Sequence, residues 1–178
     1  SIPAVVDAPA ASQPLLAVVH KKLGVVPNLM KLLGQSPAAL EGFLSLSGAL
    51  DKGVLNAKLR ESLALAVAEF NGCDYCLAAH SYIGKNLVKL TDDEIAQARD
   101  GRAADARNDA ALRFAQRVAA ERGRVLDADI AALRAAGFSD AETVEIVLHV
   151  ALNVLTNYVN NVAHTDVDFP RVSAHTHA

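Results

Sequence analysis

Both cysteines of this 178-residue chain lie in the stretch Arg60-Glu61-Ser-Leu-Ala-Leu-Ala-Val-Ala-Glu-Phe-Asn-Gly-Cys73-Asp-Tyr-Cys76-Leu-Ala-Ala-His80. Each residue of an α-helix advances by about 100°, so Cys73 and Cys76 would lie about 60° apart, with His80 between them in azimuth. His80 is within side-chain reach of Cys76 and could act as a base for its thiol or as a cation that stabilises its thiolate. The spacing therefore predicts two thiols and an imidazole on one helix face.

The residue before the first cysteine indicates that the two cysteines lie at the start of their helix. Gly72 suggests that the pair opens the helix, where free N–H groups and the helix dipole lower thiol pKa values. Glu69 and Asp74 would oppose this effect if they lie close. The two-residue gap between the cysteines also suits a disulfide. The segment is thus typical of a redox-active pair.

Other chemistries also use closely spaced cysteines. Covalent haem attachment requires a histidine directly after the second cysteine, and Leu77 stands there, which excludes it. A structural zinc site stays open as an alternative. Its ligands would be Cys73, Cys76 and His80, with Glu61, His149 or His164 as the fourth. A further alternative is that both cysteines are buried as small hydrophobic side chains beside a hydrogen-bonded histidine.

Composition narrows the class of protein. Hydrophobic residues make up 52% of the chain, enough for a substantial core, and the net charge of -3 is scattered, unlike the basic surface of a nucleic-acid binder. The apolar runs are far shorter than the roughly 20 residues of a membrane span. The sequence opens without a charged and apolar leader, so we expect a cytoplasmic protein with no membrane or nucleic-acid partner. In a reducing compartment, a cysteine pair indicates redox or metal chemistry in place of a structural disulfide.

Local patterns predict an all-α fold of about eight helices with no sheet. Aromatic residues are only 4% of the chain, and β-branched runs of period two are missing. Asn56 and Asp127 could each cap a helix, and capping boxes begin at Thr91 and Ser139, the second opening a long helix toward His164. We expect one domain over residues 1–178. Its parts would be an extended N-terminal arm over 1–14, a cysteine-motif core over 37–100 and a C-terminal helical half over 106–166.

The last long helix carries an unusual polar stripe. Its members are His149, Asn153, Asn157, Asn160 or Asn161, and His164, and a separate stripe is apolar. The apolar stripe consists of Leu148, Ala151, Leu155, Tyr158 and Val162. The polar stripe is typical of a hydrogen-bonded seam at a helix or subunit interface. Alternatively, His149 or one of the asparagines lines the pocket of the active site.

The stretch from Arg60 to His80 resembles the core of the AhpD-like superfamily, also called the carboxymuconolactone decarboxylase family. The likeness combines Glu61 twelve residues before Cys73, the gap of two residues between the cysteines, and His80 four residues after Cys76. It implies an AhpD-like helical bundle. The decarboxylase members lack the cysteine pair, so the resemblance points to the alkylhydroperoxidase branch.

Roles for the motif residues follow from this resemblance. In the peroxidase branch the second cysteine attacks the hydroperoxide and the first resolves the sulfenic acid, while a glutamate and a histidine relay protons. The resemblance thus implies that Cys76 is the nucleophile, Cys73 the resolving thiol, and Glu61 and His80 the proton relay. It also implies a homo-oligomer, a trimer or a hexamer, and a thiol or lipoyl-type protein as reductant. No cofactor or metal is expected beyond the redox-active disulfide.

One residue of the motif departs from the family pattern. AhpD carries a histidine between its cysteines, and this chain has Tyr75. A tyrosine hydroxyl can donate a hydrogen bond but is a poor base near neutral pH, so Tyr75 is expected to support the site in another way. The expected function is reduction of hydrogen peroxide or organic hydroperoxides. A disulfide reductase or redox sensor without peroxidase activity, and the zinc-binding interaction protein, are the alternatives.

Overall fold

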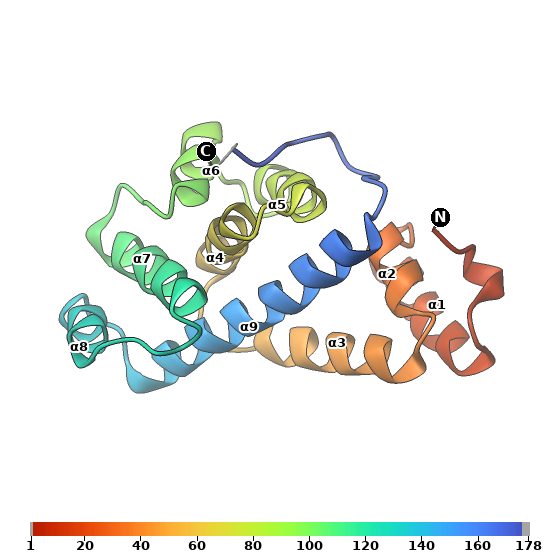
Figure 1. Ribbon diagram of the computed structural model, residues 1–178, viewed down its shortest axis with the longest axis horizontal. Helices are drawn as coiled ribbons and strands as arrows, with labels where there is room; N and C mark the ends of the chain where they lie inside the picture. The colour runs from red at the N-terminus through yellow and green to blue at the C-terminus, as the bar shows by residue number, and fades with distance from the viewer. Residues whose placement is uncertain (1, 176–178) are drawn as a thin grey trace.

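The computed structural model describes residues 2–175, which form nine α-helices and two short 3-10 helices, with no strand among them (Figure 1). This confirms the all-α prediction, with one helix more than the eight or so expected. The helices are α1 (Gln13–Leu23), α2 (Asn28–Leu33), α3 (Pro37–Leu50), α4 (Ala57–Phe70), α5 (Asp74–Asn86), α6 (Asp92–Arg99), α7 (Ala106–Ala120), α8 (Asp127–Ala135) and α9 (Asp140–Ala163). In this part of the chain, no helix is both long enough and apolar enough to span a membrane.

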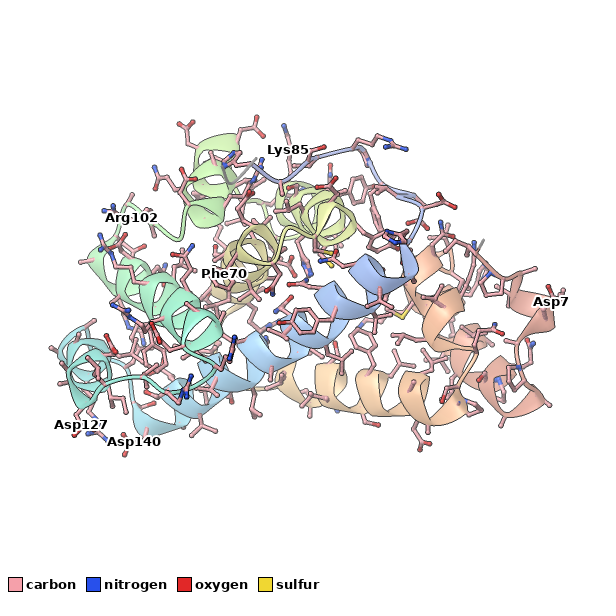
Figure 2. All side chains as sticks on the ribbon, in the orientation of Figure 1. Asp7, Phe70, Lys85, Arg102, Asp127 and Asp140 are labelled. Atoms are coloured by element: carbon pink, nitrogen blue, oxygen red, sulfur yellow. The ribbon has the colours of Figure 1, made fainter. Side chains whose placement is uncertain are left out.

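Helix α4 is the centre of the core. Its residues from Leu63 to Glu69 are all buried, and it contacts α5, α6, α7 and α9. A helix that is hydrophobic on every side is stable only when other helices surround it. Side chains from α4, α5 and α9 fill the space between these helices (Figure 2). Helices α5 and α9, which carry side chains toward the thiols, are therefore both positioned by contact with α4.

Helix ends follow the expected caps with one exception. The side chains of Asn56, Thr91 and Ser139 each accept a hydrogen bond from the backbone N–H three residues on, and the last two form full capping boxes. The prediction that Asp127 caps α8 was wrong. Asp127 is already the first helical residue, and the Asp129 carboxylate instead accepts from the N–H of Leu126 at 2.9 Å.

The N-terminal arm is not extended as expected. Residues Val5–Asp7 and Ala10–Ser12 form two 3-10 helices. The Gln13 amide donates to the carbonyls of Val5 and Ala8, at 2.8 and 3.0 Å, and so holds the coiled arm against the start of α1. Pro3, Pro9 and Pro14 are compatible with these tight turns as well as with an extended chain. Ser1, the first residue of the predicted arm, lies outside the described residues.

The C-terminal segment after α9 is irregular, but it is closely bound to the helices. Asp168 accepts a hydrogen bond from the Asn28 N–H at 2.8 Å, and Asp74 accepts one from the Ala174 N–H at 2.8 Å. The Phe169 ring packs 5.9 Å from the rings of both Tyr75 and Tyr82. The segment thus runs from the start of α2 across α5 toward α6 (Figure 1). Residues 176–178 lie outside the described part.

Helix α9 has its polar side facing inward. His149, Asn153, Asn157 and Asn160 are buried, while most of the apolar stripe is exposed to solvent. Leu155 is 40% exposed, Tyr158 58% and Val162 82%. Polar groups inside a helical protein require hydrogen-bond partners there. The polar side of α9 therefore requires hydrogen-bond partners on the helices that it packs against.

The chain turns from α4 into α5 at a residue with a left-handed backbone. Gly72 has φ of 60°, and a Cβ placed on it would meet nothing within 4 Å. We expect Gly72→Ala to lower the free energy of unfolding by about 1–2 kcal/mol, from backbone strain alone. Gly42 also has free space around its Cβ position but lies in an ordinary helical turn of α3. Gly42→Ala should leave stability unchanged or raise it by up to about 1 kcal/mol. Urea unfolding of both variants tests this, and equal effects would contradict it.

Candidate active site

The corner between α4 and α5 places Cys73. Asn71 ends α4, and the Cys73 N–H turns back to donate to the carbonyl of Ala68 at 2.9 Å. Cys73 then occupies the N-cap position of α5, where its sulfur accepts a hydrogen bond from the Cys76 N–H at 3.3 Å. A thiol thus takes the place of the usual capping oxygen. The prediction that the pair opens its helix is confirmed.

Both cysteines are free thiols and both are buried. Cys73 is 0% exposed and Cys76 is 2% exposed. Burial alone raises the pKa of a thiol, because it penalises the charged form. A buried cysteine that ionises must therefore have specific partners for its charge, and the two cysteines differ in this respect.

Cys76 has several partners that favour its thiolate. The hydrogen bond from Cys73 lowers the pKa of Cys76 most, while burial raises this pKa. The charge of His80 and the amides of Asn160 and Asn157 lower it further, and the pKa of Cys76 is about 6. The Asn160 amide donates to the Cys76 sulfur at 3.3 Å. The pKa of Cys73 is raised, chiefly because its own S–H is held by Cys76 and because it is buried. These opposite shifts favour a thiolate on Cys76 and a neutral thiol on Cys73.

Glu61 and His80 meet as the motif suggested. Oε2 of Glu61 lies 2.8 Å from Nδ1 of His80, bridging α4 and α5. The histidine side chain is 23% exposed and the glutamate 18%, so this is the side of the site nearest to solvent. Burial lowers the pKa of His80, but the charge and hydrogen bond of Glu61 and the charge of Cys76 raise it more. The imidazole is thus disposed to carry a proton, and Nε2 is the nitrogen left free.

Tyr75 takes no part in this pair. Its hydroxyl accepts a hydrogen bond from the Leu29 N–H at 3.2 Å, and its pKa is raised by burial and by a hydrogen bond to Asp168. The ring meets Phe169 edge to face. Tyr75 therefore joins the cysteine helix to α2 and to the C-terminal segment, contacts that the sequence did not specify.

The polar stripe of α9 divides into two parts. Asn157 belongs to the site: its Oδ1 accepts from the Asn71 amide at 2.9 Å, and the residue contributes to the low pKa of Cys76. His149 and Asn153 lie farther along the helix, where the Asn153 amide donates to the His149 carbonyl at 2.8 Å. The pKa of His149 is lowered, first by burial and then by the Arg60 charge. These two residues form a buried seam that is not hydrogen-bonded to the thiols.

Sequence reasoning left the role of Asn160 undecided and missed that of Asn71. The helical period gave Asn160 or Asn161 as the stripe member, and the contact with the Cys76 sulfur selects Asn160. The Asn161 amide instead donates to the Asn71 carbonyl at 3.0 Å. His164, offered by the sequence as a zinc ligand, is an exposed residue at the end of α9. Within residues 2–175, no group of three or more His, Cys, Asp or Glu side chains is placed to hold a metal ion.

Comparisons with known proteins place this site in a family. A model of the carboxymuconolactone decarboxylase family matches residues 37–121. A peroxidase-related protein from Ralstonia eutropha JMP134, described as an alkylhydroperoxidase AhpD core, is 30% identical and has a TM-score of 0.79, with 91% of this chain and 87% of that chain covered. The chain belongs to this family. No protein of curated function matches it significantly.

Two further solved structures share the fold of this AhpD-like chain. A peroxidase-related protein from Silicibacter sp. TM1040 is 26% identical with a TM-score of 0.81, covering 93% of this chain and 89% of that one. A debrominase in its apo form is 19% identical with a TM-score of 0.76, covering 89% and 87%. The second likeness concerns the fold alone. The first supports placing the chain among the peroxidase-related members.

The charge state of Cys76 can be measured by alkylation. Its pKa of about 6 means that the thiolate is lost as the pH falls through that value. We expect the rate of alkylation by iodoacetamide, followed by mass spectrometry, to rise with pH with a midpoint near that pKa. His80→Gln removes the neighbouring cation and should move the midpoint up by about one unit. His20→Gln, on exposed α1, is the matched control. A midpoint in the ordinary thiol range, or one that ignores His80, would contradict this assignment.

Proposed function

We propose that this protein is a thiol-dependent peroxidase that reduces hydrogen peroxide or organic hydroperoxides through its Cys73–Cys76 pair. The observation that carries the proposal is the difference in pKa between the two thiols. Cys76 has a pKa lowered to about 6, while Cys73 stays protonated beside it. The first is suited to attack and the second to wait as the resolving thiol.

The first step forms a sulfur–oxygen bond. The Cys76 thiolate attacks the terminal oxygen of the hydroperoxide, the O–O bond breaks, and the products are Cys76 sulfenic acid and an alkoxide or hydroxide. His80 protonates the leaving oxygen, and the Glu61 contact at 2.8 Å stabilises the imidazolium that supplies this proton. The raised pKa of His80 supports this role, because it favours the charged ring that would donate this proton.

The second step closes the disulfide. Cys73 attacks the sulfur of the sulfenic acid, its proton leaves with the hydroxyl as water, and the Cys73–Cys76 bond forms. A thiol or lipoyl-type protein would then reduce the disulfide, and a slender lipoyl arm suits sulfurs that are as buried as these. We place this cycle in the cytoplasm, where thiol reductants are available.

Burial also bears on the choice between peroxidase and disulfide reductase. A sulfur that is 2% exposed is reached more readily by a small hydroperoxide than by the disulfide of a folded partner protein. In addition, a thiolate can leave without being protonated, because it is a weaker base than an alkoxide. Disulfide exchange therefore has no need of a proton donor such as His80 beside Glu61. The Glu61–His80 pair therefore favours the peroxidase.

Stopped-flow oxidation of the reduced protein by cumene hydroperoxide tests the proposal. Cys76→Ser should abolish fast thiol loss, and Glu61→Gln should slow it by about a hundredfold, because His80 is then less often protonated and is no longer held in place. Glu41→Gln, an exposed position on α3, is the matched control.

The same variants distinguish the alternatives. If wild type loses thiols no faster than Cys76→Ser, the peroxidase proposal fails. Rapid exchange with a small aromatic disulfide that is insensitive to Glu61→Gln would then favour the reductase or sensor. Near-stoichiometric zinc in the untreated protein would favour the zinc-binding alternative.

We also propose that the protein is a homo-oligomer, a trimer or a hexamer. Helix α9 extends across the molecule (Figure 1), and the observation behind the proposal is that its apolar side is exposed to solvent. Its exposed members are Val144, Val147, Leu148, Leu155, Tyr158 and Val162. A continuous apolar strip of this kind on a single chain marks an association surface.

Substitution within the strip tests the oligomer. We expect Leu155→Glu and Tyr158→Glu to reduce the molar mass measured by light scattering after gel filtration, because a buried unpaired carboxylate disfavours the interface. Leu126→Glu, which changes another exposed apolar residue before α8, should not. A monomeric wild-type protein would overturn the proposal.

A further inference from the structure

The Cys76 sulfur lies beside two amides whose hydrogen-bonding capacity is only partly used. The Asn160 amide donates to the sulfur at 3.3 Å, but its Oδ1 has no partner among the described residues. The Nδ2 of Asn157 has no partner at hydrogen-bond distance in this part of the chain, but it lies near enough to Cys76 to help lower the pKa of that thiol. Asn157 is 0% exposed and Asn160 is 2% exposed. One free donor and one free acceptor are therefore buried next to the reacting atom.

Neighbouring groups hold the donor in place. Asn71 donates from its amide to the Oδ1 of Asn157 at 2.9 Å, which uses the acceptor of Asn157 and leaves its Nδ2 on the other side. Asn71 is itself bound by the Asn161 amide through its carbonyl. The orientation of the Asn157 amide is thus fixed by α4 and α9 together, and it does not depend on the thiol.

Buried amide atoms without partners are rare, because each loses hydration and gains nothing in return. Such atoms near a reacting group are expected where a partner is present only during the reaction. Sulfenic acid adds to Cys76 one oxygen that accepts hydrogen bonds and one hydroxyl proton that donates. Asn157 offers the missing donor and Asn160 the missing acceptor.

We propose that Asn157 and Asn160 form the binding site for the oxygen that Cys76 acquires, and that they hold the sulfenic acid in its protonated form. This inference rests on the peroxidase function proposed above. Nδ2 of Asn157 donates to the sulfur-bound oxygen, and Oδ1 of Asn160 accepts from its hydroxyl. Both residues are catalytic in the sense that they contact the reacting atoms.

The protonated form matters for the fate of the intermediate. Resolution needs an electrophilic sulfur, since Cys73 attacks it and hydroxide leaves with the thiol proton as water. Over-oxidation needs the opposite, because the sulfenate anion attacks a second hydroperoxide, breaks its O–O bond and becomes sulfinate while the alcohol leaves. An acceptor that keeps the proton on the sulfenic acid therefore favours the disulfide over the irreversible product.

The test uses a protein in which the intermediate cannot be resolved. In a Cys73→Ser background the only remaining thiol is Cys76, and hydrogen peroxide should convert it to a sulfenic acid that a dimedone-type reagent traps. Asn157→Leu and Asn160→Leu are added separately in this background, since leucine keeps the branching of asparagine at Cγ, with a larger volume, but has no donor or acceptor. Thr156→Val is the matched control. Thr156 is buried on the same helix, and among residues 2–175 its hydroxyl bonds only to backbone carbonyls of α9.

Two measurements follow the intermediate. Mass spectrometry gives the rate of conversion from sulfenic to sulfinic acid, at a pH well above the pKa of Cys76 so that every variant starts as a thiolate. We expect each leucine variant to over-oxidise about fivefold faster or more, which corresponds to one lost hydrogen bond, while Thr156→Val matches the parent. Titration of the thiolate absorbance should also show the pKa of Cys76 raised by about one unit in Asn160→Leu.

Asn160→Asp is a second variant, to be used if a leucine variant does not fold. It keeps the shape but replaces the donor with a carboxylate, and it should raise the pKa of Cys76 further by charge repulsion. Unchanged over-oxidation rates in correctly folded variants overturn the inference. If instead the Cys73→Ser parent forms no sulfenic acid at all with hydrogen peroxide or cumene hydroperoxide, the peroxidase function itself has failed. The two failures are therefore distinguished by the parent alone.

Discussion

The hydrogen bond from the Cys76 N–H to the Cys73 sulfur organises the rest of the site. It makes Cys73 the N-cap of α5, so both sulfurs are held at the end of a helix whose dipole favours negative charge. The bond requires that the chain reverse direction within a few residues of α4, and Gly72 supplies the left-handed backbone for that reversal. Because α4 is held on all sides by other helices, the position of the thiols is as fixed as the core itself.

The two cysteines are chemically different because their surroundings differ. Cys76 lies among donors, a neighbouring thiol, an amide and an imidazolium, and these together outweigh the effect of burial on its pKa. Cys73 has a single side-chain hydrogen-bond partner, the other sulfur, and burial keeps it protonated. One charge is thus stable in this pocket and two are not, which favours a thiolate on Cys76 over one on Cys73.

Helix α9 turns its polar side toward the core and its apolar side toward solvent. Its asparagines enter the core because they meet polar groups there: the Asn71 side chain, the Cys76 sulfur and the backbone of α9 itself. The apolar side is consequently left on the surface. In an isolated chain this exposes hydrophobic area at a cost of roughly 25 cal/mol for each Å² that could be buried. The same constraint thus connects the chemistry of the site with the proposal of an oligomer.

The sequence by itself determined the helical class, most caps and the motif that brings Glu61, Cys73, Cys76 and His80 together, because these depend on short-range spacing. It erred at the Asp127 cap and in the N-terminal arm, where two local conformations are close in energy and contacts such as those of Gln13 decide. Only the tertiary structure decided which side of α9 faces inward, that Tyr75 binds Leu29 and the C-terminal segment, and that Asn71 and Asn160 belong to the site. These are contacts between residues that are distant in the chain, and they depend on how whole helices pack, which a helical period cannot specify.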